Sequence, residues 1–181
     1  MAEADVAYAD SGALNGSDLN GSAGDRERRR LFADDGRRTD RGYEVSVPVR
    51  WSDMDVFQHI NHARMVTLLE EARIPWLFYD DKPTALMREG CLVADLHVKY
   101  QGQIRHDESP IRVTMFVEKL RAVDFTVGYE VRPHGAAPDS KPAVVASTQL
   151  VSFDIDTQRP RRMTAAEKAY LQGFVREPVT R

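Results

Sequence analysis

Apolar and polar side chains alternate at the start of the folded part of the chain, a pattern typical of a strand with one buried face. The apolar members of this first run are Tyr43, Val45, Val47 and Val49. The same alternation returns over residues 92–99, 111–118, 125–131 and 143–153. We therefore expect five strands in one antiparallel sheet.

A helical pattern follows the first strand, because apolar residues recur there at spacings of three and four. They are Met65, Leu68, Leu69, Ala72 and Trp76. Asn61 is the expected N-cap, and Pro75 predicts a kink or a loose last turn. A short second helix is expected over 165–174, capped by Thr164. The pattern predicts an α+β fold, a five-stranded antiparallel sheet on one long helix with a short C-terminal helix.

Residues 1–41 differ from the rest, since they contain many Ser, Gly and Asn residues and few large apolar ones. Such a composition cannot bury enough apolar surface to fold, so we expect a disordered N-terminal tail. Residues 42–181 then form one domain, in keeping with a length of 181 residues.

Composition narrows the classes of partner. A formal charge of −3 offers no general field for nucleic acid, and no stretch is long and apolar enough to span a membrane. Cys91 is the only cysteine, so an internal disulfide is excluded, and no apolar run follows a basic start at the N-terminus. We expect a cytoplasmic protein with neither nucleic-acid nor membrane partners.

The segment between the first strand and the helix concentrates reactive side chains. It reads Arg-Trp-Ser-Asp-Met-Asp-Val-Phe-Gln-His-Ile-Asn-His over residues 50–62, with two carboxylates and two imidazoles. A polar turn that opens a helix lies beside free backbone N–H groups and the positive end of the helix dipole. This arrangement suits the stabilisation of an anionic intermediate, so the segment is a candidate catalytic turn.

The same segment resembles the hotdog-fold thioesterases of the 4-hydroxybenzoyl-CoA thioesterase type. Members of that family typically read R-W-x-D-x-D-x-x-G-H-x-N-N, followed by a helix that ends near L-E-E-A-R. The matching positions are Arg50, Trp51, Asp53, Asp55, His59, Asn61 and the run from Leu69 to Arg73, with a looser likeness through Tyr100 and Phe153-Asp154. Gln58 replaces the family's glycine and His62 its second asparagine. The resemblance covers about Tyr43 to the C-terminus and implies the hotdog order of strands.

The resemblance implies that Asp55 is the catalytic carboxylate, because the family uses the second Asp of the D-x-D pair. A thioester has a weakly stabilised carbonyl and a good thiolate leaving group, so the carboxylate acts as general base or nucleophile. From the residues alone, Asp55 equally suits a helix cap or an ion pair with Arg50. Asp53 is expected to be structural, bonding the amides of its own turn or holding Arg73.

Three residues beside Asp55 complete the predicted site, namely His59, Asn61 and His62. The backbone N–H groups around Asn61 and His62 are expected to stabilise the oxyanion, while the side chains of His59 and Asn61 orient water or the carboxylate. The alternative is that these side chains only satisfy backbone groups of the turn.

Other interpretations of the segment predict different chemistry. The His59-x-x-His62 spacing beside two aspartates would also suit a metal ion, but the resembling family uses none, so we expect no metal and no cofactor beyond the coenzyme A of the substrate. A hotdog hydratase would use Asp55 and His59 together, yet its Asp-x-Asn-Pro-x-His signature is missing. A non-catalytic acyl-thioester binding module and a purely structural oligomer are the alternatives outside enzymology.

The expected substrate is a thioester of coenzyme A or of acyl carrier protein. Basic residues that could bind the carrier are Lys99, Arg105, Arg121 and Arg132, which the sequence does not rank. The acyl pocket is expected between helix and sheet, lined by Phe57, Trp51 and Met65. Because hotdog relatives pair their sheets edge to edge, the resemblance implies a homodimer or a dimer-based homo-tetramer.

Overall fold

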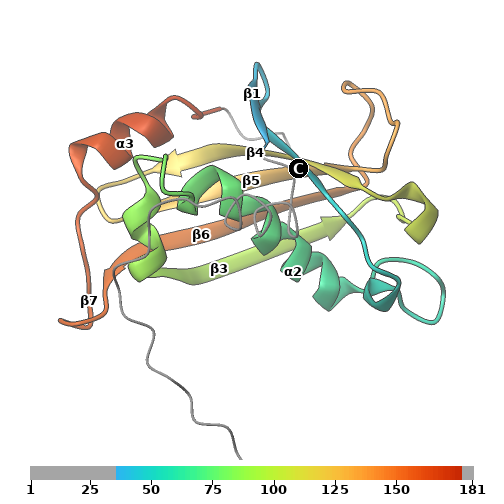
Figure 1. Cartoon of the computed structure of the whole chain (residues 1–181), viewed down its shortest axis with the longest axis horizontal. Coiled ribbons are helices and arrows are strands. Elements are labelled where there is room, and N and C mark those ends of the chain that lie inside the picture. The colour runs from blue at the N-terminus through green and yellow to red at the C-terminus, as the bar shows by residue number, and fades with distance from the viewer. Residues whose placement is uncertain (1–35, 177–181) are drawn as a thin grey trace, which may run out of the picture.

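The computed structural model describes residues 36–176, and a single antiparallel sheet runs through it (Figure 1). Its strands are β1 (Arg37–Thr39), β2 (Gly42–Val47), β3 (Cys91–Tyr100), β4 (Ile111–Leu120), β5 (Asp124–Arg132), β6 (Val144–Asp154) and β7 (Arg159–Pro160). They pair in the order β1-β2-β4-β5-β6-β3, and β7 adds to the end of β6. The five predicted strands are confirmed, and two short strands extend the sheet at its margins.

Helix α2 (His62–Arg73) lies across one face of this sheet, which wraps around it in the hotdog arrangement (Figure 1). The apolar stripe of the helix is buried against every second residue of the strands. One row of valines shows the match, because strand pairing aligns Val45 of β2, Val113 of β4, Val131 of β5 and Val144 of β6. The alternation in the sequence therefore arises because the apolar residues of these strands face α2.

The long helix changes type where Pro75 was expected to disturb it. Residues Ile74–Phe78 form a π-helix directly after Arg73, and a 3-10 helix follows over Ala85–Glu89. Proline has no N–H to donate along the helix, which explains the loosened turn. Trp76 stays fully buried there, and its ring centroid lies 6.0 Å from that of Tyr43. The late helix residues thus still serve the core.

The two ends of the described chain both add to the sheet. The expected boundary between residues 41 and 42 is wrong in detail, because β1 pairs with β2 and places residues 37–39 inside the sheet. Residues 1–35 of the expected tail lie outside the described residues. Helix α3 (Ala165–Gln172) begins at the predicted cap, where Thr164 and Glu167 form a capping box. Beyond it, the N–H of Val117 in β4 donates to the carbonyl of Phe174 at 2.9 Å.

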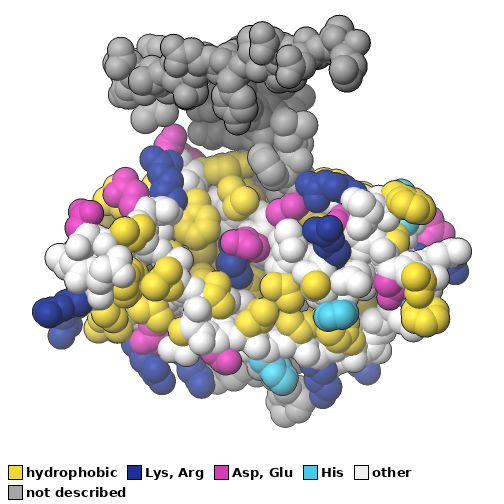
Figure 2. Space-filling model, turned by 90° about the horizontal axis from the view of Figure 1, so that it is seen from below, with side chains coloured by type: hydrophobic (Ala, Val, Ile, Leu, Met, Phe, Trp, Pro, Cys, Tyr) yellow, Lys and Arg dark blue, Asp and Glu magenta, His cyan; other side chains and the backbone are white. Residues whose placement is uncertain are grey.

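Strand β3 is the part of the sheet that departs most from expectation. It pairs with β6 alone among the described residues, so it forms one edge of the sheet. A bulge between Val93 and Asp95 shifts the alternation, and Leu92, Val93, Leu96 and Tyr100 are between 37% and 54% exposed. Figure 2, which views the molecule from the side on which β3 lies in Figure 1, shows hydrophobic side chains gathered in a band. This strand was expected to be half-buried by the helix; Cys91 and Val98 do pack against the core, but the edge position leaves its other large apolar residues partly exposed.

Cys91 opens β3 close to the buried end of α2. Burial raises the pKa of its thiol to about 11, and the nearby guanidinium of Arg73 opposes that rise only in part. The thiol therefore stays protonated near neutral pH and is a poor nucleophile.

Within residues 36–176, no helix combines the length and apolar character that crossing a bilayer requires.

We expect Cys91 to react slowly with iodoacetamide while the protein is folded. A pKa near 11 leaves roughly a hundredfold less thiolate than an ordinary thiol has at about pH 8, and burial shields the sulfur further. Labelling should be followed by mass spectrometry in buffer and in denaturant, with glutathione as the reference thiol. Equal rates for folded and unfolded protein would contradict the assignment.

Candidate active site

The turn between β2 and α2 is closed by Asp53, which is only 5% exposed. Its carboxylate accepts the N–H of Arg50 at 2.8 Å, and its carbonyl accepts the N–H of Asn61 at 2.9 Å. Asp53 thus bonds backbone amides of its own turn, one of its two predicted structural roles. The other is wrong, because the described side-chain hydrogen bond of Arg73 goes to the Tyr129 hydroxyl at 2.8 Å.

Asp55 begins a tight hairpin that projects from this turn. The N–H of Asp55 donates to the carbonyl of His59 at 2.8 Å, and the N–H of Gln58 donates back to the Asp55 carbonyl at 3.0 Å. Closing the hairpin requires a left-handed residue, and Gln58 supplies it with φ of 63°. Since this is where the resembling family carries glycine, the substitution preserves the backbone conformation at an energetic cost.

The carboxylate of Asp55 is held by the backbone of its own hairpin. Its Oδ1 accepts the N–H groups of Phe57 at 2.8 Å and of His59 at 3.1 Å. Oδ2 has no such partner among the described residues and is available for chemistry. Both structural alternatives for Asp55 are wrong, because Asn61 caps the helix and Arg50 pairs instead with Glu71 at 3.1 Å.

The first turn of α2 offers fewer free donors than the sequence suggested. The side chain of Asn61 accepts the N–H of Ala63 at 2.9 Å, which confirms it as the N-cap. Its own N–H is already bonded to Asp53, so the expectation that it faces an oxyanion is wrong. The N–H of His62 is the first helical amide and has no acceptor within the helix. The His62 carbonyl accepts the Tyr100 hydroxyl at 3.2 Å.

A largely apolar pocket of about 370 Å³ adjoins Asp55. Its lining consists of Asp55, Phe57, His59, Ile60, His62, Met65, Tyr100, Gly102, Gln103, Ile104 and Val144. Three predicted site residues, Asp55, His59 and His62, therefore meet here, whereas Asn61 is absent from the lining. Phe57 and Met65 line it as expected for an acyl pocket.

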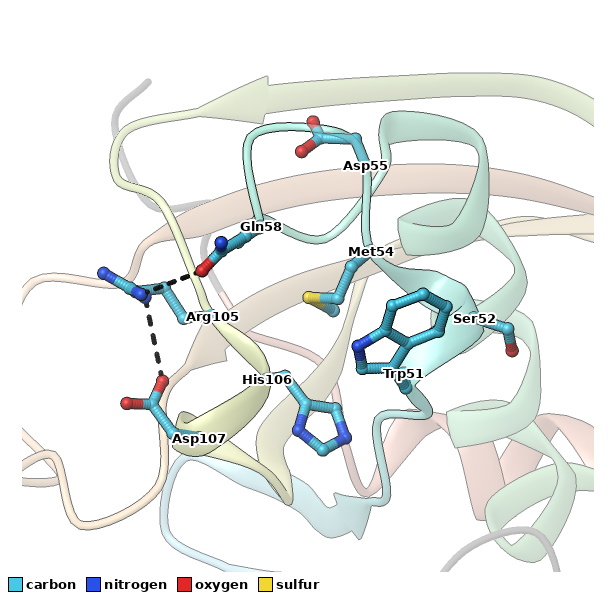
Figure 3. Close-up of a pocket in the computed structure, with 8 residues that line it drawn as sticks. All are labelled: Trp51, Ser52, Met54, Asp55, Gln58, Arg105, His106 and Asp107. Atoms are coloured by element: carbon cyan, nitrogen blue, oxygen red, sulfur yellow. Dashed lines mark hydrogen bonds and ion pairs between the residues drawn. The ribbon is translucent and has the colours of Figure 1, made fainter.

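A second, more polar cleft of about 740 Å³ lies on another side of Asp55 (Figure 3). It is lined by Trp51, Ser52, Met54, Asp55, Gln58, Arg105, His106 and Asp107. Trp51 lines this cleft and not the apolar pocket, so its predicted place in the acyl pocket is wrong. Asp55 is the one residue that the linings of these two cavities share.

Several pocket residues carried no predicted role. Tyr100, Gln103, Ile104 and Val144 come from the end of β3, the loop after it and the start of β6. The backbone brings this loop to the site, because the N–H of Ile60 donates to the Ile104 carbonyl at 3.0 Å and His59 forms a bridge with Arg105. Local sequence pattern gives no signal for pairing across such a separation. Burial raises the pKa of Tyr100, so its hydroxyl remains a donor.

The sequence also suited a metal ion held by His59, His62 and the neighbouring aspartates. His59 and His62 both line the apolar pocket, but no group of three His, Cys, Asp or Glu residues in 36–176 is placed to hold an ion.

The chain was compared with family models and with curated protein sequences. A family model described as the thioesterase-like superfamily matches residues 49–172. No curated protein sequence gives a significant match.

Solved structures resemble the fold over most of the domain. A Thermus thermophilus thioesterase in complex with coenzyme A and zinc has a TM-score of 0.60 and 22% identity, covering 75% of this chain and 96% of that one. A thioesterase-superfamily protein from a Jannaschia species has a TM-score of 0.65 and 14% identity, covering 77% and 97%. A DHNA-CoA thioesterase from Staphylococcus aureus has a TM-score of 0.55 and 24% identity, covering 66% and 78%. At such identities the likeness concerns the fold.

Replacing Gln58 by glycine should stabilise the protein, by about 0.5–1 kcal/mol in the free energy of unfolding, because glycine adopts the left-handed conformation without strain. Both variants lose the hydrogen bond from Arg105 at 3.2 Å, but Gln58→Ala also keeps the strain, so it should be neutral or slightly destabilising. Urea denaturation of both variants measures the difference. Equal stabilities for the two variants would show that the backbone at this position is unstrained.

Proposed function

The chain belongs to the thioesterase-like superfamily, and we propose that it hydrolyses an acyl thioester of coenzyme A or of acyl carrier protein through Asp55. The observation that carries the proposal is the setting of this carboxylate. Two backbone amides hold one of its oxygens, and it stands where an apolar pocket and a polar cleft meet. A thioester also has an apolar arm and a polar arm on either side of its reactive carbon.

The Asp55 carboxylate has the position of a general base or nucleophile. As a base, its Oδ2 takes a proton from water while the water oxygen attacks the thioester carbonyl carbon. Collapse of the tetrahedral intermediate then expels the thiolate and leaves the free acid. As a nucleophile, Oδ2 attacks the carbonyl carbon itself and the thiolate leaves; water then hydrolyses the resulting mixed anhydride, which releases the free acid and restores the Asp55 carboxylate. Both routes use the same free oxygen.

Negative charge that develops on the carbonyl oxygen needs a fixed donor. The N–H of His62 stands at the positive end of α2, where the helix dipole adds to its effect. The hydroxyl of Tyr100 bonds the His62 carbonyl and so holds this first turn. In this proposal Asn61 is a positioning residue, because it caps the helix without lining the pocket, while the imidazoles of His59 and His62 border the acyl group.

The relationship to the 4-hydroxybenzoyl-CoA type is part of the proposal. It is supported by the D-x-D pair and the His59-x-Asn61 spacing, and by a positive φ at Gln58 where that family has glycine.

A homodimer is the assembly that β3 favours. Within residues 36–176 one side of this strand has no pairing strand, and it carries a row of exposed apolar side chains, which a second copy of the same edge would cover. Because Tyr100 belongs both to β3 and to the apolar pocket, such a dimer would bring the partner close to the acyl site.

Asp55→Asn should reduce the rate of thioester hydrolysis by about a hundredfold or more, the scale of a lost general base. Asparagine keeps an oxygen for the amides of Phe57 and His59, so the hairpin should persist while the reactive oxygen is lost. Thiol release should be measured with short, long and aromatic acyl-CoA substrates, using Asp139→Asn on an exposed loop as the matched control.

Activity of Asp55→Asn within tenfold of the parent would remove Asp55 from the mechanism. A parent that binds an acyl thioester and returns it intact would favour the binding module instead.

Val93→Lys should weaken self-association by about two orders of magnitude, since an uncompensated charge inside an apolar interface costs several kcal/mol. Light scattering after size exclusion gives the mass of each variant. Ile155→Lys, at a similarly exposed apolar position in the turn after β6, should remain a dimer. A parent that stays monomeric at all concentrations would refute the proposed edge pairing.

A further inference from the structure

The polar cleft beside Asp55 has walls of matching construction. One wall is the 3-10 turn Trp51–Asp53, and the other is the 3-10 turn His106–Glu108. Each turn is closed by an acid that accepts the N–H of an arginine three residues earlier, at 2.8 Å in both cases. Adjacent strands anchor the two turns, because β2 ends at Val47 opposite Ile111, where β4 begins. The cleft is therefore a rigid feature of one end of the sheet.

The cleft exposes a large aromatic side chain of a kind that globular domains usually bury. Trp51 is 81% exposed, although an indole is among the largest apolar groups a core can bury. Ser52 and Gln58 add a hydroxyl and an amide to the same lining, and Figure 3 shows Trp51 and Arg105 on different sides of the cleft. A ligand with amide groups and an apolar backbone would match this lining.

Arg105 is the one basic candidate in contact with this cavity. Its side chain is 58% exposed and bonds Gln58 at 3.2 Å. Arg132 is buried against Glu130 at 2.9 Å, and Arg121 pairs with Asp124 at 3.6 Å. Lys99 points away from α2, because its neighbour Val98 packs on the core and side chains alternate along β3. The four candidates that the sequence left unranked thus reduce to Arg105.

Resting on the proposed function, we propose that this cleft binds the phosphopantetheine arm of the substrate carrier, with Arg105 pairing with its phosphate. When the thioester carbonyl lies at Asp55 and the acyl group fills the apolar pocket, the sulfur and everything beyond it must leave by another route. The polar cleft is a second cavity that Asp55 lines, and it offers such a route. The amides of the arm lie against Trp51 and Gln58, and its phosphate reaches the guanidinium.

Asp107 gives the proposal a second, opposite prediction. Its carboxylate is 81% exposed and lies 3.9 Å from the Arg105 side chain, on the same cleft. A negative charge there competes for Arg105 and repels a phosphate. Removing Arg105 and removing Asp107 should therefore change substrate binding in opposite directions.

The test compares acyl-CoA with the matching S-acyl-pantetheine, which lacks the phosphate. For Arg105→Ala, kcat/KM with acyl-CoA should fall about tenfold, as expected when a charge-assisted bond is lost, and the preference of the parent for acyl-CoA should largely disappear. For Asp107→Asn, that preference should increase. Arg121→Ala, on an exposed arginine remote from the cleft, is the matched control and should behave like the parent. Trp51→Ala should lower kcat/KM on both substrates, because both keep the pantetheine amides.

The outcomes separate this inference from the proposed function. The cleft does not bind the phosphate if Arg105→Ala lowers activity equally on both substrates, or if Asp107→Asn lowers the preference for acyl-CoA over S-acyl-pantetheine. If that result is obtained and Asp55→Asn is nevertheless inactive in the same assays, the carrier site is refuted while the hydrolytic role of Asp55 is retained. The proposal is supported if Arg105→Ala loses the preference for the phosphate-bearing substrate over S-acyl-pantetheine, whether that substrate is acyl-CoA or acyl carrier protein. The better of these two substrates identifies which carrier supplies the arm.

Discussion

The site depends on the two bonds that Asp53 makes to the chain on either side of the hairpin that carries Asp55. Its carboxylate holds the N–H of Arg50 and its carbonyl holds the N–H of Asn61, so the end of the first strand and the start of α2 are joined at one buried residue. Residues 54–60 can then only project outward as a closed hairpin. The distance between Asp55 and the helix dipole is set by this junction, and neither group has to be positioned by its own side chain.

Backbone hydrogen bonds provide most of the organisation around Asp55. The hairpin amides hold one carboxylate oxygen, and the Ile104–Arg105 segment bonds the far side of the hairpin. Such a scaffold places a reactive group with little side-chain entropy to lose, because its partners are already fixed by the fold. The hairpin accordingly tolerates a side chain where its backbone is left-handed, as Gln58 shows with a φ of 63°.

Periodicity predicted the strands and the helix because packing on α2 imposes it directly, as the aligned row of Val45, Val113 and Val131 shows. The same signal was less informative on β3, where it revealed neither the bulge between Val93 and Asp95 nor the partial exposure of an edge strand. The motif singled out Asp55, which lines both cavities, but it could not show that the Asn61 amide is already bonded. Tyr100 and Arg105 join the site through pairing between distant segments, which local patterns do not encode.

The two margins of the sheet are unequal, and this limits how the protein can assemble. At one margin β1 has three residues, while at the other β3 offers ten. A strand as short as β1 is a weak template for another chain. Among the described residues, β3 is therefore the one long edge to which another strand could add, and in the proposed dimer each copy would cover the β3 of the other. A pairing of identical edges closes on itself, so the proposed dimer would leave no long strand edge of residues 36–176 open to a further copy.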